Sequence, residues 1–302
     1  MIERDLEGYA GQPPDPKWPN GARIAVQFVL NIEEGAESCV LNGDDQSEAY
    51  LHELFGREPR LGERDLSVES MYEYGSRAGV WRILNIFNWN KLPLTAFACG
   101  LALELNPSVA QALVAAGHEI AGHGYRWLDY RHIDEAVERE HIRTTHKCIE
   151  RLTGEREVGW YIGRTSVNTR KLLGEVSQVL YSSDSYSDDL PYWSYTPKPR
   201  LIIPYSLVNN DVRYLFPNGC ASAEDFFQIL KDAFDLLWLE GESQAKMLTV
   251  GLHGRISGHP ARAMALLQFI DYIQNHEKVW ICRRSDIAKH WISQHPSAGG
   301  SS

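Results

Sequence analysis

The sequence has few cysteines and lacks long apolar runs, and each absence excludes a class of protein. Five cysteines occur in 302 residues, each alone and none in a CxxC pair, so neither a disulfide framework nor a zinc knuckle is expected. No run of 18 apolar residues is present, so no membrane span is expected. The phosphate-binding patterns GxGxxG and GxxxxGKS/T are also missing, which argues against a nucleotide site.

Positive charge is the minority sign. Lysine and arginine total 30 against 40 aspartates and glutamates, which gives a formal net charge of −10 and argues against nucleic acid or an anionic membrane as a partner. Residues 1–5 are polar and lack the hydrophobic core of a secretory signal, so a cytoplasmic location is expected. The Ser- and Gly-rich tail, 297–302, is expected to be flexible.

Short apolar runs alternate with helical patterns along most of the chain. Strands are predicted at 23–31, 92–98, 118–122, 158–161, 178–181, 201–205, 247–252 and 279–282. Such alternation indicates parallel strands with crossover helices, and about seven repeats favour a distorted (β/α) barrel formed by one domain, 1–302. Two polar segments, at about 35–75 and 183–221, interrupt the rhythm and are predicted to form an accessory lobe that covers the barrel mouth.

Polar side chains follow several of these strands. In a β/α barrel the active site lies at the carboxyl ends of the strands, so residues from distant parts of the sequence are expected to meet there. The candidates are Asn31, Glu33, Glu34, His123, Tyr161, Arg164, Asp184 and His253. Simpler interpretations exist: the glutamates can form a solvated turn, His253 can be a satisfied core histidine, and Asp184 can cap a turn.

The spacing of His123 and Trp127 is the most informative local pattern. Two histidines four residues apart are a common zinc-binding pair. Here the second position holds an indole, which has no lone pair to offer a metal. The pattern therefore indicates a metal site that lacks one ligand, in which Trp127 either belongs to the core or forms the wall of a small pocket. His118, five residues earlier, is expected to pin a turn.

These residues resemble the polysaccharide deacetylase family. The resemblance rests on 117–123, on the strand that ends in Leu252-His253, and on the stretches 31–35, 72–81, 123–127, 159–165 and 188–193. In that family an aspartate pair supplies a base and a metal ligand, an HxxxH motif completes the metal site, and a late histidine is the general acid. This chain has Glu33-Glu34 and Trp127 at those positions, a combination similar to the metal-independent allantoinases of the family.

The resemblance implies a function and a set of roles. The first hypothesis is a metal-independent cyclic amidase that opens the hydantoin ring of allantoin; the alternatives are a metal-dependent sugar-amide deacetylase and a non-catalytic carbohydrate-binding relative. We expect Glu33 or Glu34 to orient or deprotonate water, His253 to be the acid/base partner, and His123 to be a further polar contact.

The substrate contacts and the assembly are also expectations. Arg164 and Tyr161 are expected to bind substrate oxygens, and Asn31, Trp127 and Asp184 complete the predicted substrate-binding set. Asn31 and Glu33 point to the same side of an ideal strand and Glu34 to the other, so the sequence leaves open which glutamate takes the ligand position. The expected partner is a small ureide, with no metal or other cofactor, and the resemblance implies a homotetramer.

Overall fold

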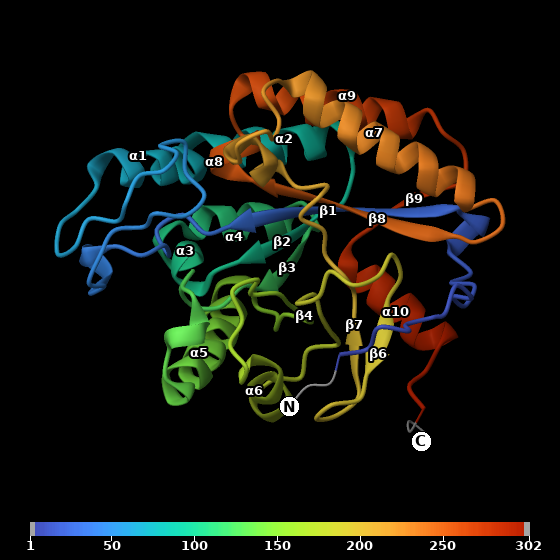
Figure 1. Ribbon diagram of the computed structural model, residues 1–302, viewed down its shortest axis with the longest axis horizontal. Coiled ribbons are helices and arrows are strands. Elements are labelled where there is room, and N and C mark those ends of the chain that lie inside the picture. Colours follow the sequence, from blue (N-terminus) through green and yellow to red (C-terminus); the bar gives the residue numbers. More distant parts are fainter. Residues whose placement is uncertain (1–3, 299–302) are drawn as a thin grey trace.

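The computed structural model describes residues 4–298 and consists of helices packed around one curled sheet (Figure 1). Within this range the sheet has nine strands. Eight of them follow the order β6-β7-β5-β4-β3-β2-β1-β8, and the ninth, β9, pairs with the first part of β1. The strands are β1 (Ile24–Ile32), β2 (Thr95–Ala98), β3 (Glu119–Gly122), β4 (Gly159–Trp160), β5 (Tyr181–Ser182), β6 (Tyr192–Ser194), β7 (Arg200–Ile202), β8 (Lys246–His253) and β9 (Val279–Ile281). All pairings are parallel except β6–β7. The sheet forms a half-barrel, and the predicted α/β barrel class is confirmed.

Helices fill most of the connections between strands. They are α1 (Leu66–Tyr74), α2 (Val80–Asn90), α3 (Gly100–Leu105), α4 (Pro107–Ala115), α5 (Glu135–Thr153), α6 (Thr169–Val176), α7 (Ala223–Glu240), α8 (Gly254–Ser257), α9 (Pro260–Gln274) and α10 (Arg284–Gln294). A π-helical turn, η3 (Gly75–Gly79), joins α1 to α2, and a 3-10 turn, η5 (Asp211–Leu215), precedes α7. Figure 1 shows α7 and α9 lying side by side against β1, β8 and β9.

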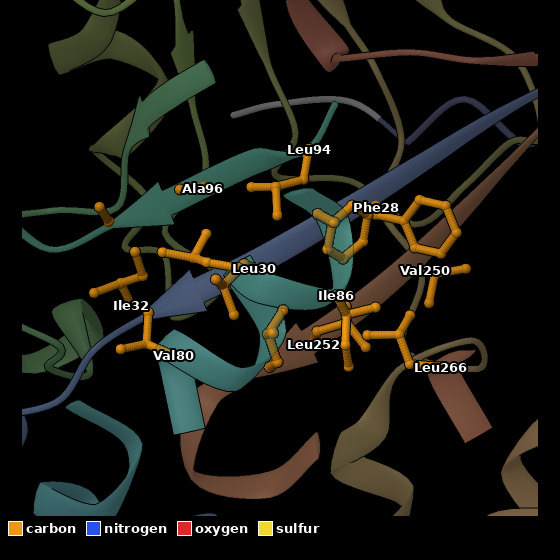
Figure 2. Close-up of a cluster of buried hydrophobic side chains, with 14 of the residues drawn as sticks. Phe28, Leu30, Ile32, Val80, Ile86, Leu94, Ala96, Val250, Leu252 and Leu266 are labelled. Carbon is orange, nitrogen blue, oxygen red and sulfur yellow. The ribbon is translucent and has the colours of Figure 1, made fainter. Parts of the chain in front are cut away.

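The central strand β1 divides the core into two sides. Successive side chains of a strand point to opposite faces of its sheet. Phe28, Leu30 and Ile32 face the helices, where they pack with Val250 and Leu252 of β8 and with residues of α2 and α9 (Figure 2). Burying this apolar layer contributes about 25 cal/mol per Å² and anchors β1 and β8, whose last residues carry the polar groups of the barrel mouth.

The inner face of β1 is different. Val29 packs there against Phe97, Tyr161 and Tyr205, and Arg284 at the start of α10 is also fully buried. Its guanidinium donates to Gln27 and Ser183 side chains, among other acceptors. Because a buried charge is costly unless it is hydrogen-bonded, this arrangement ties α10 to the strands below the mouth.

The two interrupting segments contain more regular structure than the sequence suggested. Segment 35–75 includes α1, whose N-cap Asp65 accepts hydrogen bonds from Ser67 and Val68, and segment 183–221 includes β6, β7 and η5. The sheet contains β6 in addition to the eight strands predicted from the sequence, because this three-residue strand is too short to show an alternation. Most of the predicted flexible tail lies outside the described residues. No helix in the described range is both long and apolar enough to cross a membrane.

Candidate active site

The strand register brings the ends of β1, β2, β3, β4 and β8 to one place. Asn31 lies opposite His253, Ile32 opposite Ala98, and Gly122 opposite both Ala98 and Trp160. The residues that follow these strand ends are therefore neighbours in space. Glu33, His123 and Tyr161 each come one residue after a strand, so the sequence-based expectation that they meet agrees with their place in the structure.

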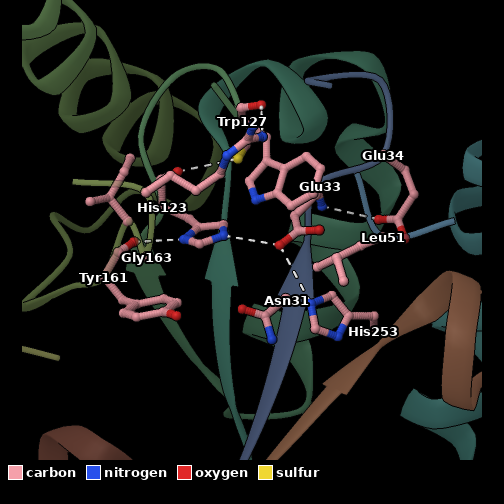
Figure 3. A network of polar contacts seen from close by, with 12 residues as sticks. Asn31, Glu33, Glu34, Leu51, His123, Trp127, Tyr161, Gly163 and His253 are labelled. Carbon is pink, nitrogen blue, oxygen red and sulfur yellow. Dashed lines mark hydrogen bonds and ion pairs between the residues drawn. The ribbon is translucent and has the colours of Figure 1, made fainter. Parts of the chain in front are cut away.

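Glu33 is the centre of the site (Figure 3). Its Oε1 lies 3.1 Å from His123 Nε2 and 3.5 Å from His253 Nε2, and its Oε2 lies 2.6 Å from Nη1 of Arg255. Burial alone would raise the pKa of Glu33, but the positive charge of Arg255, followed by the contacts with His253 and His123, holds it well below its usual range. Glu33 is therefore a buried carboxylate anion.

His123 is fixed on both ring nitrogens. Nδ1 donates to the carbonyl oxygen of Tyr161 at 2.6 Å, and the ring stacks on that of Tyr161, with centroids 5.3 Å apart and planes 7° from parallel. Since a carbonyl oxygen can only accept, the proton on Nδ1 is fixed and Nε2 faces Glu33. Nε2 and Glu33 Oε1, 3.1 Å apart, are then placed to hold a further proton between them when a reaction releases one.

His253 is paired with an aspartate that the sequence analysis did not identify. Its Nδ1 lies 2.7 Å from Asp211 Oδ1, and its backbone N–H donates to Asp211 Oδ2 at 2.7 Å. Burial would lower the pKa of His253, but the negative charges of Asp211 and Glu33 outweigh burial and raise it to about 9. At neutral pH His253 therefore carries a proton that it can donate.

Glu34 points away from the pocket. Its Oε2 accepts from the backbone N–H of Glu33 at 3.1 Å, and its Oε1 lies 3.8 Å from Arg255 Nη1. Burial, with a smaller contribution from the charge of Glu33, raises the pKa of Glu34 above its usual value despite Arg255. Of the two glutamates left open by the sequence, Glu33 is the one that faces the histidines.

These groups line a small pocket of about 90 Å³. Its walls are Asn31, Glu33, Tyr50, Leu51, His123, Trp127, Tyr161, Ile162, Gly163, Arg164, Tyr186, Tyr205, Leu207, Asn210, Val212 and His253. Tyr50 and Leu51 come from segment 35–75, and five further wall residues, from Tyr186 to Val212, come from segment 183–221. Both interrupting segments therefore contribute to the pocket and reduce its size.

Trp127 and Arg164 form one wall of the pocket. The indole of Trp127 stacks on Tyr50, with centroids 6.1 Å apart, and the guanidinium of Arg164 lies over both rings, 4.8 Å from Trp127 and 5.4 Å from Tyr50. Arg164 also lies 3.5 Å from Glu48. Cation–π contacts of this kind fix the direction of a guanidinium, so Arg164 presents a positioned positive charge at the pocket wall.

Of the three other predicted substrate contacts, Asn31 and Tyr161 line the pocket and Asp184 does not. Asn31 lines the pocket and donates to Tyr205 Oη at 3.0 Å and to the carbonyl of Leu252 at 3.1 Å. Tyr161 also lines it. Asp184 does not: its Oδ1 accepts from the backbone N–H groups of Ile162 and Gly163 at 2.9 and 2.8 Å. The structure thus gives Asp184 the place of a support for the loop before Arg164 and not the predicted place beside a substrate.

The donor set fits a zinc ion poorly. A zinc site needs at least three nitrogen, oxygen or sulfur ligands with complementary charge. Trp127 provides none, and the guanidinium of Arg255 already holds one oxygen of Glu33 at 2.6 Å. Across residues 4–298 no three His, Cys, Asp or Glu side chains are grouped to hold a metal.

Arg255 and Asp211 are the two important residues that the sequence analysis missed. Arg255 stands two residues after His253, and its place just beyond a strand end was the available signal. Asp211 lies within a polar segment rich in Ser, Asp and Pro, where nothing distinguishes it from the aspartates that cap turns. Outside the pocket, His118 accepts from the Leu94 N–H through Nδ1 at 3.3 Å, a structural role as expected.

Comparison with known proteins identifies the family of the chain. The family model described as "Polysaccharide deacetylase" matches residues 62–181. The chain is 41% identical to the "Putative polysaccharide deacetylase" of Schizosaccharomyces pombe, over 97% of this chain and 98% of that protein. A solved structure described as a probable polysaccharide deacetylase of Pseudomonas aeruginosa PAO1 is 55% identical, covers 97% of this chain and 99% of its own, and has a TM-score of 0.95.

A second solved structure is named for a different activity. The PuuE allantoinase structure is 53% identical to this chain, covers 99% of this chain and 100% of its own, and superposes with a TM-score of 0.96. Both structures and the yeast protein are similar to this chain over nearly its whole length, beyond the segment that the family model matches. The chain belongs to the polysaccharide deacetylase family and has the hydrolase fold of that family.

Proposed function

We propose that this protein is an allantoinase, a hydrolase that opens the hydantoin ring of allantoin to give allantoate. The observation that carries the proposal is the pocket itself, in which an anionic Glu33 lies between two histidines and next to an arginine, with Trp127 in the place of a metal ligand. The similarity to PuuE allantoinase over the full chain supports it.

The first step is attack by water on a ring carbonyl carbon. Glu33 Oε1 and His123 Nε2 lie 3.1 Å apart and face the same small space, so a water molecule there can be oriented toward the carbonyl. A carboxylate with a lowered pKa is a weak base. Glu33 therefore orients the water, and the proton that the water loses is taken up between Glu33 Oε1 and His123 Nε2 as the carbon–oxygen bond forms. This leaves a tetrahedral carbon with a negative oxygen.

The second step is cleavage of the ring carbon–nitrogen bond. The departing nitrogen needs a proton, and His253 carries one at neutral pH because Asp211 and Glu33 raise its pKa to about 9. His253 Nε2 faces the pocket side of Glu33 while Nδ1 stays bonded to Asp211. We therefore assign His253 as the general acid and Asp211 as the residue that holds its ring in place.

Substrate recognition is assigned to the surrounding walls. Arg164 offers a fixed cation to a carbonyl or ureido oxygen, and one such donor at a developing oxyanion commonly contributes a few kcal/mol. Asn31 and Tyr161 complete the polar lining, and Trp127 closes the pocket beside them. A pocket of about 90 Å³, reduced by residues of both interrupting segments, suits a small ring better than a polymer.

The proposal is tested by incubating the purified protein with allantoin and, separately, with N-acetylglucosamine oligomers, and following allantoate and acetate by NMR. We expect allantoate and no acetate, and a loss of about 10² or more in kcat for His253→Gln, as for removal of a general acid. Release of acetate without allantoate would instead favour a deacetylase, the activity for which two of the similar proteins are named.

A further inference from the structure

Arg255 is a fully buried arginine in direct contact with the central carboxylate. Its Nη1 lies 2.6 Å from Glu33 Oε2 and 3.8 Å from Glu34 Oε1, and its Nε donates to the carbonyl of Leu51 at 3.4 Å. The side chain is 2% exposed. A buried charge is retained only where a partner compensates it, and here the partner is Glu33.

Two aromatic faces hold the guanidinium from the sides. Its central carbon lies 4.4 Å from the ring of Tyr72 and 5.2 Å from the ring of Trp127. Aromatic faces carry negative partial charge and attract cations, most strongly when the pair is desolvated. Trp127 cannot bind a metal, but its indole stabilises the Arg255 cation that pairs with the Glu33 carboxylate.

Glycines in the neighbouring turn allow it to pack closely against the backbone around Arg255. The residue lies in α8, against which the π-helical turn η3 packs. A Cβ on Gly75 would collide with Glu34 Oε1 and with the backbone nitrogen of Arg255, and a Cβ on Gly79 would collide with the carbonyl of Gly254. π-Helical turns are rare and occur often at functional sites, and this one lets α1 and α8 approach closely.

We propose that Arg255 and Trp127 together take the place of the metal ion that the family resemblance implies. Arg255 supplies the fixed positive charge on Glu33, and Trp127 supplies a face that holds Arg255 where a second histidine would have held the metal. An arginine has no empty coordination position, so Arg255 acts through Glu33 as a positioning residue. The inference rests on the proposed hydrolytic role of this site.

A consequence is that the two residues must be exchanged together to recover a metal site. Trp127→His alone would add a third ligand beside Glu33 and His123, but the cation of Arg255 would still occupy the carboxylate and repel zinc. Arg255→Gln alone would remove the cation but leave two ligands. The double variant, Trp127→His/Arg255→Gln, would have three ligands and an unpaired carboxylate, the minimum for a catalytic type of zinc site.

The test is zinc stoichiometry after equilibrium dialysis against zinc and removal of loosely bound metal, read by elemental analysis. We expect about one zinc ion per chain for the double variant and essentially none for the wild type or either single variant. Trp127→His/Arg262→Gln is the matched control. Arg262 also pairs with a glutamate, Glu53, and lies 4.6 Å from the ring centre of Tyr214, but it does not line the pocket. This control should bind no zinc.

Two results would overturn the inference. One is zinc binding by Trp127→His as tight as that of the double variant, which would mean that Arg255 does not occupy the metal's place. The other is a folded double variant, checked by circular dichroism, that binds no zinc. If Arg255→Gln prevents folding, the zinc stoichiometry of Trp127→His alone remains a test. Bound zinc in that variant contradicts the inference, and absence of zinc supports it. Since allantoin is not used, failure here is distinct from failure of the proposed function.

Discussion

Asp211→Asn should shift the pH dependence of turnover without removing any group from the pocket. Asp211 accepts from the His253 ring and from the backbone N–H groups of His253 and Ser257. It is fully buried and does not line the pocket. Asparagine has nearly the same shape but only one acceptor oxygen, so the substitution removes one of the two acceptors together with a negative charge 2.7 Å from the imidazole.

The size and sign of the effect follow from the causes of the shifted pKa. Burial lowers the pKa of His253, and Asp211 is the larger of the two charges that raise it to about 9. A neighbouring opposite charge is typically worth ~1–3 pKa units, each about 1.4 kcal/mol. An acid works only while protonated, so activity is present below the pKa and lost above it. In Asp211→Asn the alkaline decline should move down by ~1–3 pH units.

The assay is the pH profile of kcat/KM for allantoin, because that ratio reports the free enzyme. Asp184→Asn is the matched control, because its half-buried carboxyl lies next to the pocket but accepts from the backbone N–H groups of Ile162 and Gly163 and not from a histidine ring. Its alkaline decline should stay near that of the wild type. If Asp211→Asn lowers kcat/KM equally at every pH and leaves the alkaline decline in place, the charge of Asp211 does not set the pKa of His253.

Three further predictions concern the stability of the fold, substrate binding and assembly. The raised pKa of His253 means that its stabilisation of the fold is fully present below about pH 6.5 and is lost as pH rises through about 9; urea unfolding should therefore show a falling free energy of unfolding across this range, and a flat result would contradict it. Arg164→Ala should raise KM for allantoin by roughly 10-fold or more with a smaller change in kcat, since it removes a binding contact, whereas Arg262→Ala should change neither. The family resemblance predicts a homotetramer, and light scattering that gives the mass of one 34.3 kDa chain would refute it.

The sequence predicted the barrel and the meeting of distant residues because both follow from local patterns. Parallel strands must end at the same edge of the sheet, so polar residues just beyond a strand end become neighbours whatever their separation in sequence. This rule placed Glu33, His123 and Tyr161 together with His253. The rule succeeds for these residues because each lies at its strand end or one residue beyond it. The strand then still determines the direction of the side chain.

The rule failed where a loop decides the direction of a side chain. Asp184 lies two residues beyond β5 and turns to accept backbone N–H groups, while Glu34 turns away from the pocket one residue after Glu33. Asp211 reaches His253 from 42 residues away along the chain, through a segment without periodicity. Such long-range pairs depend on tertiary packing, which a single sequence does not show.

The most direct test of the central claim is allantoin ring opening by the purified protein after exhaustive chelation, followed by NMR detection of allantoate. We expect turnover undiminished by the chelator, since Glu33, His123, His253 and Arg255 provide every charge that the proposed steps require. Absence of allantoate before and after chelation would contradict the proposed activity. Turnover lost with the chelator and restored by zinc would contradict the place given to Arg255 and Trp127.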